Sequence, residues 1–256
     1  MIFSSLSTRY KPLACLGLLV LLVQAPMYAQ RMASPAAPTA PISAIAQPDS
    51  GTIAPYTAGD AVDDFRLQGE DGRYYALSDY ATAPAAVVVF TCNSCPCVEG
   101  YDTRMVWLTR FLAAEGIPVL AINANRADRR WGESLDDMRT RADSAGYNFP
   151  YLIDETQAVA RRFGATRTPE AFVLGRDPHG VFRLLYSGAI DDRPGDPTGV
   201  TRHYVNEAIA MYREGAVPDR LRVEPMGCTI EGISRSASVC PMETMEDNVR
   251  KQLELR

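Results

Sequence analysis

The chain has 256 residues, of which 46% are hydrophobic and 22% charged, and these proportions exclude collagen-like, coiled-coil and fully disordered classes. This length is enough for one large core with additional segments and too short for two large domains. The formal net charge of -5, from 26 basic and 31 acidic residues, lacks the basic excess that a nucleic-acid-binding protein needs.

Residues 1–29 have the pattern of a secretory signal peptide. Arg9 and Lys11 precede an apolar run from Pro12 to Val23, and the small residue Ala29 follows after a short polar break. Such a run has the length of a signal-peptide core and is shorter than a typical membrane-spanning helix. We therefore expect cleavage after Ala29 and export to the periplasm or the cell exterior, where disulfides persist. An uncleaved segment that attaches the chain to the membrane is the alternative.

The remainder of the chain divides into three parts by composition. Residues 30–58 are rich in Ala and Pro and almost without charge, which predicts a flexible linker. Residues 59–217 are expected to form the folded domain, and residues 218–256 a C-terminal tail that carries Cys228 and Cys240.

Apolar periodicity predicts strands and helices that alternate along this domain. A Glu-Asp-Gly turn at 70–72 indicates a hairpin between residues 64–67 and 74–77. Further strands are expected at 85–91, 117–123, 151–154, 170–174 and 181–186, and helices at 98–112, 135–145, 156–163 and 203–214. The order of these elements predicts an α/β fold with a central mixed sheet and helices on both of its faces.

Cys92 and Cys95 form a C-x-x-C pair between the expected strand at 85–91 and the helix after it. We expect Cys92 at the helix N-terminus, where backbone amides and the helix dipole stabilise a thiolate, with Cys95 one turn further within bonding distance. Zinc sites use the same spacing, but structural zinc normally needs a second pair, which Cys228 and Cys240 do not form. The pattern therefore favours redox chemistry with no metal or other cofactor.

The segment Thr-Cys-Asn-Ser-Cys-Pro-Cys at 91–97 resembles the C-N-x-C-P motif of thioredoxin-like redoxins, the group of the alkyl hydroperoxide reductase and thiol-specific antioxidant proteins. Further segments that are similar to this group lie at 149–157, 164–174, 186–192 and 218–230. The resemblance implies a thioredoxin-like fold. It also implies that Pro169 is the family's cis-proline, which turns the Thr168 backbone toward the cysteines and offers hydrogen bonds to an extended substrate.

The other cysteines depart from this group. Cys97 stands where an aromatic residue is common, and it is either a small buried residue of the first helical turn or a third redox sulfur. Because the tail has only scattered apolar groups, we expect a structural disulfide between Cys228 and Cys240 after export. A bond between Cys97 and Cys228 is the alternative; with the expected pairing, Cys97 is the remaining thiol.

These features predict an exported thiol–disulfide oxidoreductase in which Cys92 attacks, Cys95 resolves, and Thr168 and Pro169 line the substrate groove. Its partners would be protein dithiols or disulfides, or a redox partner protein, without nucleic acid.

Two other functions remain as alternatives. A peroxiredoxin-like peroxide reductase would use Cys95, but Cys92 occupies the position where the peroxiredoxin signature has Thr. A copper-binding assembly protein would use cysteine sulfurs as soft ligands, but such carriers have a C-x-x-x-C pair and a distant His. His179 and His203 are instead expected to be surface residues.

Overall fold

The central strand is β3 (Ala85–Thr91), in which every residue is buried. It pairs in parallel with β4 (Val119–Asn123) and antiparallel with β7 (Glu170–Arg176). A strand with neighbours on both sides and helices over both faces must be apolar throughout, so its sequence shows no alternation. The computed structural model describes residues 54–126, 132–218 and 221–233, and all of them belong to one compact unit.

The main sheet has eight strands in the order β2-β1-β5-β4-β3-β7-β8-β9. Its other members are β1 (Arg66–Gly69), β2 (Tyr74–Ala76), β5 (Tyr151–Ile153), β8 (Phe182–Gly188) and β9 (Arg222–Val223). A second, two-stranded sheet consists of β6 (Arg167–Thr168) and β10 (Cys228–Thr229).

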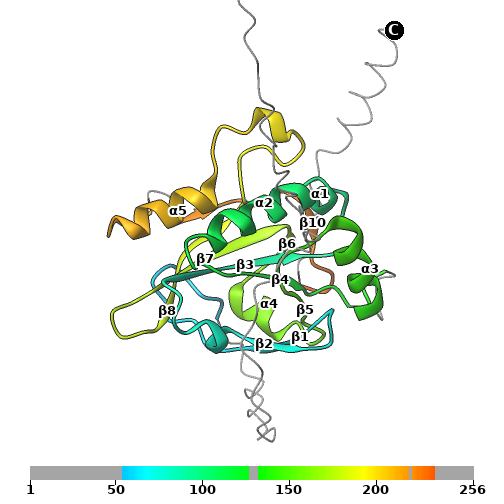
Figure 1. The fold of residues 1–256 in the computed structure, drawn as a ribbon, viewed down its shortest axis with the longest axis horizontal. Helices are drawn as coiled ribbons and strands as arrows, with labels where there is room; N and C mark the ends of the chain where they lie inside the picture. The colour runs from blue at the N-terminus through cyan, green and yellow to red at the C-terminus, as the bar shows by residue number, and fades with distance from the viewer. Residues whose placement is uncertain (1–53, 127–131, 219–220, 234–256) are drawn as a thin grey trace, which may run out of the picture. The chain divides into compact units, whose positions relative to one another are not determined.

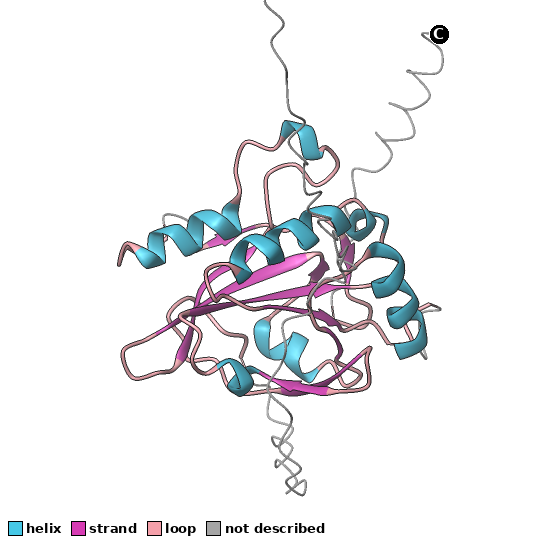
Figure 2. Cartoon of the chain, viewed as in Figure 1, coloured by secondary structure: helices cyan, strands magenta, loops and turns pink. Residues whose placement is uncertain are grey.

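Helices cover both faces of the main sheet (Figure 1, Figure 2). They are α1 (Pro96–Glu99), α2 (Asp102–Ala113), α3 (Leu135–Ala145), α4 (Ala158–Phe163) and α5 (Tyr204–Arg213), with 3-10 turns at Leu77–Tyr80 and Pro197–Gly199. One face packs against α2 and α5 through Val87, Val89, Met105, Leu112 and Ile209. The other face packs against α4 through Val88, Phe90, Leu120, Ile122 and Phe163.

This arrangement confirms the predicted thioredoxin-like α/β fold and its mixed sheet. The helix expected over 98–112 is two helices, because Gly100 ends α1 and Tyr101 caps α2.

The folded part extends beyond the predicted domain in both directions. Tyr56, in the predicted linker, is buried and makes an edge contact with the ring of Phe163. After residue 217, β9 pairs in parallel with β8 and forms the edge of the main sheet, and Ile230 is fully buried. Backbone pairing and burial therefore hold the first part of the predicted tail, which was expected to need a disulfide.

The predicted signal peptide, its cleavage position Ala29 and the tail cysteine Cys240 lie outside the described residues. Within the described part of the chain, none of the helices is long and apolar enough to cross a membrane.

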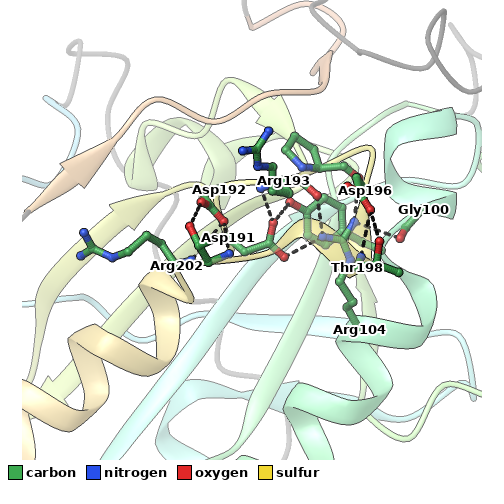
Figure 3. A network of polar contacts seen from close by, with 11 residues as sticks. Gly100, Arg104, Asp191, Asp192, Arg193, Asp196, Thr198 and Arg202 are labelled. Atoms are coloured by element: carbon green, nitrogen blue, oxygen red, sulfur yellow. Dashed lines mark hydrogen bonds and ion pairs between the residues drawn. The ribbon is translucent and has the colours of Figure 1, made fainter.

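A polar network joins the loop after β8 to the helices that follow the cysteine pair (Figure 3). Asp191, only 3% exposed, accepts hydrogen bonds from Tyr101 Oη at 2.8 Å and from Arg104 Nη1 at 2.7 Å. Arg104 also donates to the backbone carbonyls of Gly100 and Pro194. The C-terminus of α1 is thereby fixed to this loop.

Candidate active site

The two cysteines of the pair lie at different kinds of position. Cys92 directly follows β3, whereas Cys95 is the N-cap residue of α1 and Pro96 is its first helical residue. Proline favours that first position because its fixed φ suits the helix and its missing N–H is not needed there. The expectation that Cys92 lies at the helix N-terminus is therefore wrong, since the chain needs Asn93 and Ser94 to pass from strand to helix.

The Cys95 sulfur is surrounded by hydrogen-bond donors. The thiols of Cys228 and Cys92 donate to it, and the backbone N–H groups of Val98 and Cys228 also stabilise its charge. These donors outweigh burial, which acts in the opposite direction, and lower the pKa of Cys95 to about 2. Cys95 is therefore the thiolate of the site.

Cys92 has the opposite character. Its hydrogen bond to Cys95, its burial and the negative charges of Cys95 and Glu133 raise the pKa of Cys92 well above its ordinary value. The Thr168 hydroxyl, with Oγ1 3.1 Å from the Cys92 sulfur, acts against them. The reduced pair thus consists of one thiolate and one thiol, and both residues are at most 1% exposed.

The strand β6 faces this pair as the family resemblance implies. The Thr168–Pro169 peptide bond is cis, and the Thr168 carbonyl oxygen lies 3.4 Å from the Cys95 sulfur. That carbonyl can accept a hydrogen bond from Cys95 only when the thiol is protonated. The backbone edge expected to receive a substrate is occupied, because Thr168 pairs in register with Cys228 of β10.

Cys228 and Cys97 differ from the predictions. Cys228 is a thiol, so the predicted Cys228–Cys240 disulfide is wrong, and so is the alternative bond between Cys97 and Cys228. Strand pairing places Cys228 against Cys95 instead. Cys97 is buried in the first turn of α1, as expected, but it is disulfide-bonded and not the remaining thiol.

Sequence reasoning missed Glu133, a fully buried acid that holds the loop between the two cysteines. Its carboxylate accepts hydrogen bonds from the backbone N–H groups of Asn93 at 2.9 Å and Ser94 at 3.1 Å. The amide groups of Asn123 and Asn125, at the end of β4 and just beyond it, donate to the same carboxylate. The only local signal for Glu133 is its position before the Ser-x-x-Asp capping box of α3.

Among the described residues, no group of three or more His, Cys, Asp or Glu side chains is arranged to hold a metal ion. His179 and His203 are exposed, which confirms their prediction as surface residues.

Known proteins resemble this chain in sequence and in fold. Residues 58–182 match the model of the AhpC/TSA family. The chain is similar to the crystal structure of a hypothetical protein from Sinorhizobium meliloti, with 32% identity, a TM-score of 0.62, and 70% of this chain and 96% of that chain covered. It is similar also to an uncharacterized conserved protein from Geobacillus kaustophilus, with 33% identity, a TM-score of 0.62, and coverage of 71% and 95%. Among curated proteins, none matches this sequence.

Proposed function

Because the chain belongs to the AhpC/TSA family of thioredoxin-like redoxins, we propose that this oxidoreductase exchanges thiols and disulfides through Cys92 and Cys95. The observation that carries the proposal is the contact between a thiolate, Cys95, and a thiol, Cys92, at the junction of β3 and α1. A dithiol with one ionised sulfur has both the nucleophile and the resolving group that disulfide exchange requires.

The order of attack follows from the ionisation of the two sulfurs. The Cys95 thiolate attacks one sulfur of the substrate disulfide, and the other substrate sulfur leaves as a thiolate. Cys92 then gives up its proton to that leaving thiolate and attacks the Cys95 sulfur, which releases the second substrate sulfur. The products are a Cys92–Cys95 disulfide and a substrate dithiol that has gained two electrons. This order reverses the roles that the sequence predicted.

Insulin reduction with dithiothreitol as the electron source tests the proposal. We expect the Cys95→Ser protein to be inactive, because it lacks the thiolate. The Cys92→Ser protein should form mixed disulfides with insulin that resolve slowly. Near-wild-type turnover of the Cys95→Ser protein, with near-ultraviolet circular dichroism unchanged, would contradict the proposal.

Peroxide reduction is a second candidate, favoured by the position of Cys95 at the N-terminus of α1. The thiolate would attack a peroxide oxygen, which yields a sulfenic acid and an alcohol or water, and Cys92 would then condense with it to a disulfide and water. The threonine of the peroxiredoxin signature is absent, since Cys92 stands at its position. We therefore expect single-turnover rate constants for hydrogen peroxide well below ~10⁷ M⁻¹s⁻¹. A value at or above that limit would make peroxide the primary substrate.

We also propose that the protein acts outside the cytoplasm. The disulfide at Cys97 supports this location, because such bonds are rare in reducing compartments. N-terminal sequencing of the mature protein from a periplasmic or culture fraction should give Gln30 as its first residue. Recovery of the complete chain from the cytoplasm alone would contradict export.

A further inference from the structure

We infer that Cys228 is a third redox-active cysteine, which forms a disulfide with Cys95 in exchange for the Cys92–Cys95 disulfide. The inference rests on the proposed dithiol function and adds a sulfur from the opposite end of the domain sequence. It concerns the route by which electrons pass between the buried Cys92–Cys95 pair and an external redox partner.

The register of β10 on β6 places Cys228 beside the pair. Cys228 lies directly opposite Thr168, whose hydroxyl contacts the Cys92 sulfur and whose carbonyl lies against the Cys95 sulfur. Cys92, Cys95 and Cys228 belong to one buried cluster, and Figure 1 shows β10 next to α1. All three sulfurs are therefore gathered around a single residue of β6.

The segment that carries Cys228 is fixed on both sides. A Cβ atom at Gly227 would lie 2.0 Å from the Thr168 carbonyl oxygen, so the close approach of the two backbones requires glycine there. Arg167 Nη1 donates to the Gly227 carbonyl at 3.1 Å. On the other side, the Ile230 N–H donates to the Thr166 carbonyl at 3.0 Å. The chain itself thus occupies the edge where an added substrate strand would present its sulfur to Cys95.

The sulfur contact is already suited to exchange. In the reduced protein the Cys228 thiol donates its hydrogen bond to the Cys95 sulfur. Once Cys92 and Cys95 are oxidised, Cys228 attacks the Cys95 sulfur, the Cys92–Cys95 bond breaks, and a Cys95–Cys228 bond forms. The proton of Cys228 passes to Cys92, so the exchange needs no external oxidant or reductant.

This exchange moves the disulfide toward the surface. Cys228 is 8% exposed, whereas Cys92 is 0% exposed and Cys95 1%. A thiolate of a protein dithiol can then attack the Cys228 sulfur, with Cys95 as the leaving group. Disulfides break faster when the departing sulfur is a stabilised thiolate, and the Cys92 thiol and the Val98 N–H remain to stabilise Cys95 in this step. The partner indicated for Cys228 is thus a reducing protein dithiol.

Oxidation of the Cys92→Ser protein with one equivalent of diamide tests the bond directly. After alkylation and peptide mapping, we expect to find a Cys95–Cys228 disulfide. Adding Gly227→Ala, which displaces β10 but retains both thiols, should lower the yield of this disulfide by about tenfold. Recovery of Cys228 as an alkylated thiol, with Cys95 modified alone or linked between molecules, would overturn the inference.

A kinetic measurement separates this inference from the proposed function. The oxidised Cys228→Ser protein should be reduced by a thioredoxin about tenfold more slowly than the oxidised wild-type protein. Both proteins are first oxidised with diamide and their Cys92–Cys95 disulfide is verified by peptide mapping, so the measured rate does not depend on how Cys228 affects formation of that bond. An unchanged rate would contradict the role of Cys228 and leave disulfide exchange by the pair intact. Failure of the wild-type protein to form the Cys92–Cys95 disulfide would instead contradict the proposed function, whatever the diamide product.

Discussion

Replacement of Glu133 by glutamine is expected to loosen the loop between the redox cysteines without removing either sulfur. One carboxylate oxygen accepts the Asn93 N–H and the Asn123 amide, and the other accepts the Ser94 N–H, the Ser94 hydroxyl and the Asn125 amide. Glutamine keeps one acceptor oxygen and presents an NH₂ group to the donors at the other. Whichever way the new amide is oriented, at least two donors lose their acceptor.

The cost follows from the number of lost bonds. Hydrogen bonds to a charged acceptor contribute about 1.5–3 kcal/mol each, so the loss of two is expected to cost about 3–6 kcal/mol of unfolding free energy. Complete burial of Glu133 means that water does not replace the lost acceptor. Because small domains are stable by about 5–15 kcal/mol, the Gln variant should fold but with a large loss of stability. Removal of the charge should also lower the pKa of Cys92, which Glu133 raises.

Urea unfolding of the reduced protein, followed by circular dichroism, measures the effect. Asp136→Asn is a matched control from the start of α3, because its carboxylate is exposed and pairs only at the surface with Arg139. This control should change the unfolding free energy by less than about 1 kcal/mol. If Glu133→Gln were as mild as Asp136→Asn, the carboxylate would not be the anchor of the loop.

Two further predictions concern ionisation and the loop after β8. Because the pKa of Cys95 lies below its ordinary value, its thiolate should persist on acidification and disappear only as the pH approaches about 2. The ultraviolet absorbance of the thiolate in the reduced protein, compared with that of a Cys95→Ser control, measures this titration. An ordinary thiol titration near pH 8–9 would contradict the site geometry. Asp191→Ala should destabilise the protein by about 3–5 kcal/mol in urea unfolding, because it leaves the largely buried Arg104 without its carboxylate partner. A loss below about 1 kcal/mol would show that the polar network in Figure 3 does not stabilise the fold.

The sequence predicted those elements whose causes are local. The strand at 85–91 and the helix at 135–145 have their predicted bounds. The strand is a continuous apolar run, and the helix has a Ser134 cap and a left-handed Gly146 at its end. The strands β6, β9 and β10 were missed because each has only two residues, so they show no periodicity and arise from pairing between distant segments.

In the candidate active site, too, features with a local sequence motif were predicted, and contacts between distant segments were not. The cysteine pair and the cis bond before Pro169 were recognisable from short motifs. The contact of Cys228 with Cys95 depends on the register of a two-residue strand, and Glu133 reaches the loop from 39 positions beyond Ser94. Neither relation has a fixed spacing in sequence, and no apolar pattern marks a buried acid. A structural disulfide was therefore the simplest expectation for Cys228, although strand pairing gives it a different position.

Which cysteine attacks is determined by where the helix begins, and the C-x-x-C spacing alone leaves that start undefined. Pro96 decides it, because proline at the first helical position makes Cys95 the cap residue and leaves Cys92 at the end of the strand. The Val98 N–H, in the first turn of α1, then donates to the Cys95 sulfur. The thiol and the backbone N–H of Cys228, in β10, donate to the same sulfur. The thiolate is therefore produced jointly by a local cap and a distant strand. A change that shifts β10 alone should weaken the acidity of Cys95 while α1 and its cap stay in place.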